Sequence, residues 1–202
     1  MMTTKQTYKT GLGTSDADSI TLLGHDLATE ILGKYSFGEL SYYLITKRRP
    51  TPGQLVMFEA VLASLADHGF TPTAIAARLT YASAPDSLQG ALAAGLLGGG
   101  SRFLGVTEDC AHFLARELKE IGNAPTNQNG WDAAALNAVQ KQRDIGKFVP
   151  GLGHPVHKQG DPRTPVLMAI AREQGLFGSH LSLFEAIGRV HSQVLGKTLP
   201  LN

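Results

Sequence analysis

Residues 151–163, Gly151-Leu-Gly-His-Pro-Val-His-Lys-Gln-Gly-Asp-Pro-Arg163, form the most informative stretch of this chain. No apolar periodicity runs through them, so we expect a loop rather than the interior of a helix or a strand. The glycines let the backbone approach a ligand closely. Arg163 carries a planar fork that matches a carboxylate, and His154 can donate a hydrogen bond or carry a proton near neutral pH. This combination suits a loop that binds and polarises a small polycarboxylate.

The composition indicates a globular protein without an evident macromolecular target. The 202 residues can form one domain or two small ones, and 43% hydrophobic against 17% charged residues can build a substantial core. The net charge of +1 gives no general attraction to nucleic acid or to a membrane. No apolar run approaches the ~20 residues of a membrane span, and residues 1–13 lack the apolar region of a secretory signal. The single cysteine, Cys110, excludes an internal disulfide and fits a cytoplasmic location.

Helical spacing dominates the chain and predicts a mainly α-helical protein. Capping boxes begin at Thr51 and at Asp86, and small residues between Ala91 and Gly95 predict close helix packing. Only a segment near the start of the chain is a candidate for extended structure. The loops at 98–106 and 147–163 are natural places for a site, because helix breakers cluster there. Helices are expected over residues 51–68, 72–83, 86–97, 107–121, 131–143, 164–174 and 181–195.

Several common site motifs are excluded by the residues themselves. Gly98-Gly-Gly-Ser101 is followed by Phe103, where a nucleophile elbow needs glycine two residues after the serine. No phosphate-binding loop ends in Gly-Lys-Ser/Thr, and Gly151-Leu-Gly153 lacks the third glycine of a dinucleotide-binding turn. Cys110 and His112 lie two residues apart on a predicted helix, where side chains do not face each other. We therefore expect no metal site.

The stretch 151–163 resembles the G-[FILY]-G-H-R-V-Y-K…D-P-R signature of the citrate synthase superfamily. The resemblance implies that His154 meets the hydroxyl or carbonyl oxygen of the citrate or oxaloacetate moiety and is the candidate for taking the hydroxyl proton. It also implies that Arg163 grips a carboxylate. Two positions depart from the signature: Pro155 stands where arginine is common, and His157 stands where tyrosine is common. We expect His157 to contribute to substrate binding.

A second segment, beginning Leu65-Ala-Asp-His-Gly69, resembles the family's A-D-H-G…P-S-x-x-A-A-R…A-S-T segment. In the family this histidine contacts oxaloacetate, and the role would fall on His68. The local alternative is a cation placed at a helix C-terminus, where the helix dipole favours it. Weaker similarities extend the resemblance to nearly the whole chain, at residues 24–27, 37–46 and 50–52.

The third segment separates two groups within the family. Citrate synthases carry G-P-L-H-G-G, whose histidine stabilises the enol of acetyl-CoA, whereas residues 97–105 contain no histidine. They resemble instead the G-D-R-F/H-G-G stretch of citryl-CoA lyases, including the C-terminal module of ATP-citrate lyase. Arg102 would face a carboxylate or the thioester, although Ser101 and Leu104 depart from that stretch. Lys147 and Lys158 are candidates for binding the phosphates of coenzyme A.

The resemblance implies an all-α fold of two domains, a large one over residues 1–105 and a small one over 106–202, with the site between them. It also implies a homodimer with helix 87–97 at its interface. The reaction would cleave citryl-CoA into acetyl-CoA and oxaloacetate, with coenzyme A entering as part of the substrate and no further cofactor. The family's catalytic aspartate and closing helices would follow Asn202, so we expect a fold incomplete at the C-terminus and little turnover by these residues alone.

Two other functions fit the same residues. A citrate or 2-methylcitrate synthase would condense acetyl-CoA or a related acyl-CoA and then hydrolyse the thioester, but the missing histidine at residues 97–105 speaks against it. A non-catalytic helical binding or assembly module would keep the fold without the chemistry, and Pro155 favours it. Titration with acetyl-CoA, oxaloacetate and citrate distinguishes these functions, because only the module would not respond.

Overall fold

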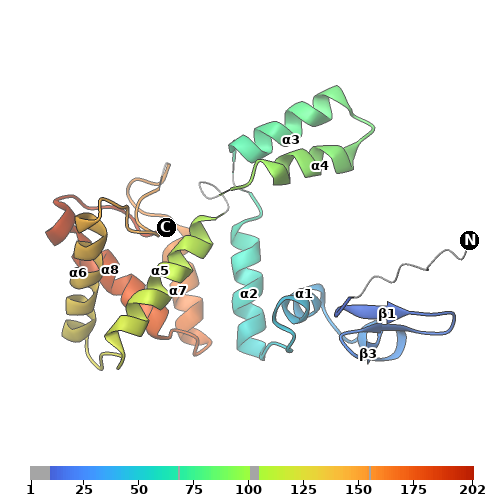
Figure 1. Cartoon of the computed structure of the whole chain (residues 1–202), viewed down its shortest axis with the longest axis horizontal. Coiled ribbons are helices and arrows are strands. Elements are labelled where there is room, and N and C mark those ends of the chain that lie inside the picture. Colours follow the sequence, from blue (N-terminus) through green and yellow to red (C-terminus); the bar gives the residue numbers. More distant parts are fainter. Residues whose placement is uncertain (1–9, 68, 101–104, 155) are drawn as a thin grey trace, which may run out of the picture. The chain divides into compact units, whose positions relative to one another are not determined.

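A computed structural model describes residues 10–67, 69–100, 105–154 and 156–202, and helices dominate it as predicted (Figure 1). The chain divides into two compact units, Met1–Leu62 and Ala63–Asn202. The domain boundary expected near residue 105 stays a prediction. The elements are β1 (Gly13–Ser15), β2 (Ile20–Leu22), β3 (His25–Asp26), the π-helix η1 (Leu27–Ile31), α1 (Phe37–Thr46), α2 (Pro52–Ser64), α3 (Pro72–Ser83), α4 (Leu88–Leu97), α5 (Val106–Ile121), α6 (Gln128–Asp144), α7 (Arg163–Glu173) and α8 (Ser179–Leu195).

The first unit begins with a small antiparallel sheet in the order β1-β2-β3. Its strands are two or three residues long, too short for the alternation that reveals a strand in sequence. The Asp26 side chain then accepts from the Thr29 backbone N–H and caps η1. Helix α1 starts at a capping box between Ser36 and Glu39. Local side-chain caps therefore set where both helices begin.

Helix capping agrees with the sequence at one predicted box and differs at the other. Thr51 and Gln54 exchange side-chain to backbone hydrogen bonds of 3.1 and 3.3 Å, which confirms the box at the start of α2. The box expected at Asp86 does not form. Helix α4 starts at Leu88, so Ser87 is the N-cap residue, and its backbone is not in the extended conformation that aims a side chain at the first turn. Helix α2 also ends earlier than expected, at Ser64, followed by a tight turn.

Helices α3 and α4 pack side by side as a helical hairpin (Figure 1). Gly95 lies against α3, where an added Cβ would meet Ala77 Cβ at 3.2 Å and the Thr73 carbonyl oxygen at 3.3 Å. Ala91 is buried. The small residues therefore allow the close helix packing that the sequence predicted.

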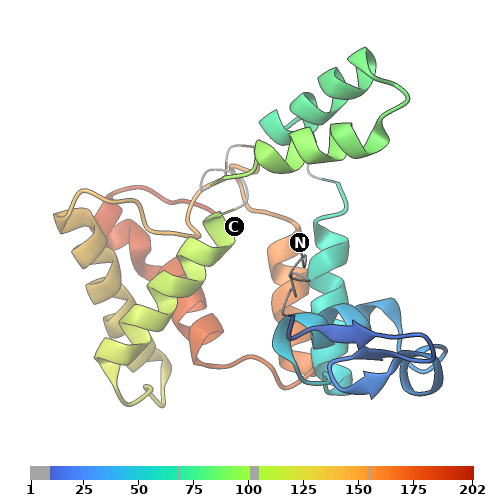
Figure 2. The same cartoon turned by 45° about the vertical axis from the view of Figure 1, so that its right-hand side comes forward.

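The main core of the second unit lies among α5, α6 and α8 (Figure 2). Phe113, Val139, Leu183 and Ile187 are almost completely buried in it. Val149, in the segment after α6, belongs to the same core. The loop that follows is therefore anchored to the core at its first residues. Among the helices that the structure describes, none is both long and apolar enough to cross a lipid bilayer.

Candidate active site

The loop between α6 and α7 begins in tightly packed surroundings. Gly151 has φ +83°, and an added Cβ would lie 2.5 Å from the Phe184 ring and 2.9 Å from Cys110 Sγ. Only glycine fits here, because its conformation and the space both exclude a side chain. Burial raises the pKa of the Cys110 thiol to about 11. This pKa fits a packed, unreactive cysteine.

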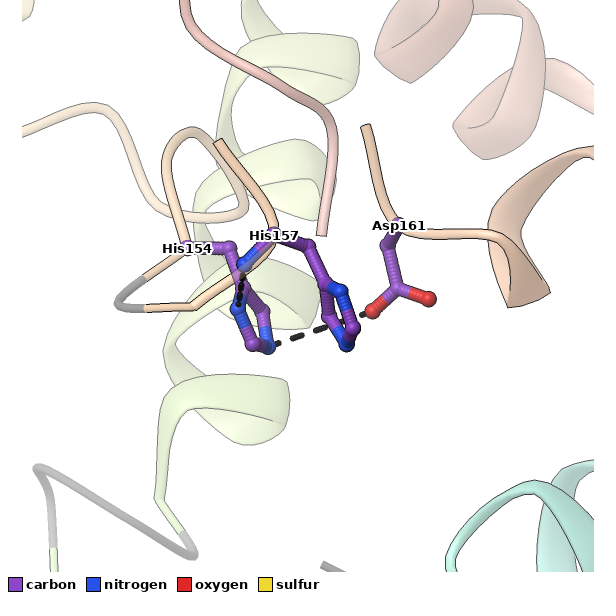
Figure 3. Close-up of side chains that lie close together, drawn as sticks. All are labelled: His154, His157 and Asp161. Carbon is purple, nitrogen blue, oxygen red and sulfur yellow. Dashed lines mark hydrogen bonds and ion pairs between the residues drawn. The ribbon is translucent and has the colours of Figure 1, made fainter. Parts of the chain in front are cut away.

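His154 is held by the backbone of its own loop. Its Nδ1 accepts a hydrogen bond from the backbone N–H of Val156 at 3.0 Å. It accepts a second one from the backbone N–H of His157 at 2.9 Å (Figure 3). Backbone amides can only donate, so Nδ1 has no proton, and the neutral ring carries its hydrogen on Nε2. The side chain is 8% exposed, and Nε2 lies 3.9 Å from Asp161 Oδ2. His154 is therefore arranged as a hydrogen-bond donor.

Asp161 anchors Arg163. Its carboxylate accepts from Arg163 Nε at 2.9 Å and from Nη2 at 2.5 Å, and it also accepts from the Arg163 backbone N–H at 2.9 Å. The hydrogen bonds to the guanidinium hold the pKa of Asp161 at about 2, below its usual value of 3.8. Asp161 is therefore a carboxylate at neutral pH and fixes the plane of the guanidinium.

Arg163 keeps capacity for a further anion. Its Nη1 donates to the Ser64 carbonyl at 3.1 Å, beside the two side-chain bonds to Asp161. Within the part of the chain that the structure describes, these contacts engage three of the guanidinium's N–H groups, and a guanidinium has about five in all. The remaining N–H groups can donate hydrogen bonds to a carboxylate of a ligand.

The other predicted loop residues lie around these two. The His157 ring lies beside the His154 ring, with 4.5 Å between centroids and the two ring planes tilted by 39° (Figure 3). Lys158 Nζ donates to the His154 carbonyl at 2.9 Å, so this lysine also braces the loop. Lys147 is exposed in the turn after α6.

The structure places His154, His157 and Asp161 in one cluster, and Asp161 binds Arg163. The sequence offered a signal for Asp161, since it stands two residues before Arg163 in Gly-Asp-Pro-Arg, but no anchoring role was assigned to it. The other two predicted site residues, His68 and Arg102, lie outside the described residues. Their roles stay predictions.

The same cluster offers three potential metal ligands. One atom each of His154, His157 and Asp161 lies within 4.8 Å of the others. The donor set does not suit a cation, because Asp161 is bound to a guanidinium and the His154 ring presents a hydrogen at Nε2. A metal would have to displace both. The donors suit an anionic or carbonyl-containing ligand better.

Comparisons with known proteins identify related folds. The family model for the citrate synthase C-terminal domain matches residues 10–199. The structure of citryl-CoA lyase from Hydrogenobacter thermophilus matches with a TM-score of 0.83 and 32% identity, over 98% of this chain and 72% of that chain. A search of curated proteins found no match.

Two structures of ATP citrate lyase match at lower identity. The enzyme from Methanothrix soehngenii, in complex with citrate and coenzyme A, gives a TM-score of 0.80 at 23% identity. A mutant enzyme from Methanosaeta concilii, in complex with (3S)-citryl-CoA, gives 0.74 at 23% identity. Each match covers 100% of this chain and 31% of that chain. These two matches support the fold alone.

Proposed function

Because the chain belongs to the citrate synthase family, we propose that the natural protein cleaves a citryl-CoA-type thioester into acetyl-CoA and oxaloacetate. The observation that carries this choice is the lack of any histidine in residues 97–105, where the family's synthases have the one that stabilises the acetyl-CoA enol. The 32% identity to a citryl-CoA lyase supports the same choice.

In this proposal Arg163 binds a carboxylate of the oxaloacetate half with the N–H groups that Asp161 and Ser64 leave to it. Asp161 keeps the guanidinium in one orientation, so less side-chain entropy is lost when the substrate binds. His68 and Arg102 would add contacts to the same half or to the thioester. Lys147 and Lys158 remain the candidates for the phosphates of coenzyme A.

His154 would act on the oxygen of the tertiary alcohol. During cleavage this O–H loses its proton, the C–O bond becomes a carbonyl, and the electrons of the breaking C–C bond form the acetyl-CoA enolate. That enolate then takes a proton at carbon. A donor at His154 Nε2 stabilises the charge that develops on the oxygen.

The sequence had assigned the proton of the alcohol to His154 as well. The two backbone N–H groups at Nδ1 argue against that assignment, because the neutral ring has no lone pair left to accept a proton. We assign proton acceptance instead to His157, the neighbouring imidazole. Histidine titrates near neutral pH and commonly serves as a general base.

We also propose that the protein is a homodimer. Leu88, Leu92 and Leu96 lie four residues apart on α4 and are 62%, 60% and 71% exposed. This spacing places them on one face of the helix. A second copy of the same face would bury this leucine stripe.

The test is to supply citryl-CoA and measure oxaloacetate release, and separately to supply acetyl-CoA plus oxaloacetate and measure free thiol. We expect the full-length protein to cleave citryl-CoA and to release little thiol from the second pair. H154A should slow cleavage by about two to three orders of magnitude, the usual cost of removing one donor to a developing oxyanion. H112A, which changes an exposed histidine on α5, is the matched control and should keep the parental rate.

Robust thiol release from acetyl-CoA and oxaloacetate would instead identify a synthase. No turnover and no binding of either substrate set would identify a non-catalytic module. An H154A protein that cleaves citryl-CoA at the parental rate would remove His154 from the mechanism.

A further inference from the structure

We propose that His191 is a positioning residue that holds the His154 loop in place through the C-terminal segment Thr198–Asn202. The structural part of this inference rests on hydrogen bonds and on side-chain packing. Its catalytic consequence rests on the proposed function.

His191 is buried on α8, with 1% of its surface exposed. Its Nε2 accepts the backbone N–H of Leu199 at 2.8 Å, and Nδ1 lies 2.9 Å from the Ile187 carbonyl oxygen. A backbone amide must donate, so Nε2 has no proton and the ring's hydrogen is on Nδ1, bonded to Ile187. Both nitrogens are therefore engaged, and one of them fixes the chain after α8.

The segment held by His191 pairs with the start of the His154 loop. Gly153 N–H donates to the Pro200 carbonyl at 2.8 Å, and Asn202 N–H donates to the Gly151 carbonyl at 2.9 Å. Leu152 and Leu201 form an antiparallel bridge between these two bonds. The last residues thus hold Gly151–Gly153 along one side.

Side-chain packing seats the same segment on α8. Leu201 lies over Gly188, where an added Cβ would meet its Cδ1 at 2.7 Å and its Cγ at 3.0 Å. Thr164 Oγ1 also donates to the Leu201 carbonyl at 3.4 Å. Helix α8 therefore holds this segment in two ways. His191 accepts a hydrogen bond from Leu199, and Gly188 leaves room for the Leu201 side chain.

The catalytic link is Gly153, which directly precedes His154. Its φ is +90°, and among the described residues nothing lies within 4 Å of where its Cβ would be. Packing at that point does not hold this glycine, which is the most flexible residue type. Among the described residues, the backbone hydrogen bond to Pro200 fixes this glycine. Loss of the His191–Leu199 bond would loosen this contact and change the direction in which His154 points.

The experiment compares H191F, H191Q and H180F in the full-length protein. Phenylalanine fills the same space without an acceptor, whereas glutamine offers an oxygen near the position of Nε2. His180 is an exposed histidine on the same helix and provides the control. Amide hydrogen exchange at Leu199 and Gly153 gives the structural readout, and citryl-CoA turnover gives the catalytic one.

We expect H191F to speed exchange at both amides by about tenfold, the effect of losing one buried hydrogen bond. It should lower kcat by about tenfold to a hundredfold with KM little changed, because a displaced catalytic group costs rate. H191Q should restore both readouts, and H180F should change neither. Parental exchange at Leu199 and Gly153 in H191F would overturn the proposal. Faster exchange with an unchanged kcat would overturn its catalytic part.

A second variant tests the segment without changing His191. G188A should displace Leu201 and speed exchange at Gly153 and Asn202 while the helix remains intact, since alanine favours helix. If H191F does not fold, parental exchange in G188A still contradicts the proposal. If the parental protein cleaves no citryl-CoA, the proposed function fails while the exchange data still decide the role of His191.

Discussion

His154 and His191 carry opposite neutral tautomers, and in each case a backbone N–H decides which nitrogen lacks a proton. Two amides face Nδ1 of His154, so its hydrogen lies on Nε2. One amide faces Nε2 of His191, so its hydrogen lies on Nδ1. The same residue type therefore presents a donor toward the proposed substrate at one position and serves as an anchor within the fold at the other.

The lowered pKa of Asp161 leads to a prediction about stability in acid. Its pKa in the folded protein is about 2, against 3.8 for the unperturbed group. A lowered pKa contributes stability that is complete above the unfolded value and is lost as the pH falls through the folded value. The difference in free energy of unfolding between the parent and D161N should therefore be constant above about pH 5 and shrink toward pH 2. Urea denaturation at several pH values measures it.

Arg163 provides the control for this prediction, because its guanidinium is the main cause of the lowered pKa. In an R163Q background the further change D161N should show little of this pH dependence. If the difference in free energy of unfolding between the parent and D161N stays constant down to pH 2, the anchoring role of Asp161 is contradicted.

At the scale of elements, the α3–α4 hairpin depends on one small residue. Gly95 leaves no room for a larger side chain against Ala77 and Thr73. G95L should lower the free energy of unfolding by about 1–3 kcal/mol, the usual cost of overpacking, despite the better helix propensity of leucine. Ala93 is exposed on the same helix, so A93L is the control and should stay within about 0.5 kcal/mol of the parent.

Hydrogen exchange of α3 and α4 amides, together with denaturant titration, measures this effect. Equal stability of the G95L and A93L proteins would show that the two helices can separate at no cost. It would then remove close packing as the reason for glycine at this position.

At the scale of the whole molecule, the proposed homodimer predicts twice the 21.5 kDa of one chain in sedimentation at micromolar concentration. The double variant L92D/L96D should sediment as a monomer, because the charges would have to be buried at the interface. Ile20, in β2, is 51% exposed, and I20D serves as a control with a similar loss of apolar surface. A parental protein that sediments as a monomer would refute the homodimer.

The sequence alone determined much of the helical framework and the candidate loop. Helices α3 and α5 begin and end within one residue of prediction, because periodicity and breakers act between residues close in the chain. The stretch 151–163 also identified His154 and Arg163 as candidates and pointed to the citrate synthase family, which the comparisons confirm.

Only the tertiary structure decided how these residues are held. The tautomer of His154, the anchoring of Arg163 by Asp161 and the pairing of Gly153 with Pro200 do not follow from residue types. The short sheet β1–β3 could not be predicted from the sequence either. Its strands are too short to show the alternation of apolar and polar residues that indicates a strand. The physical reason is that periodicity reports only neighbours along the chain. A contact such as Leu199 with His191 depends on the path by which α8 and the last residues return to the loop.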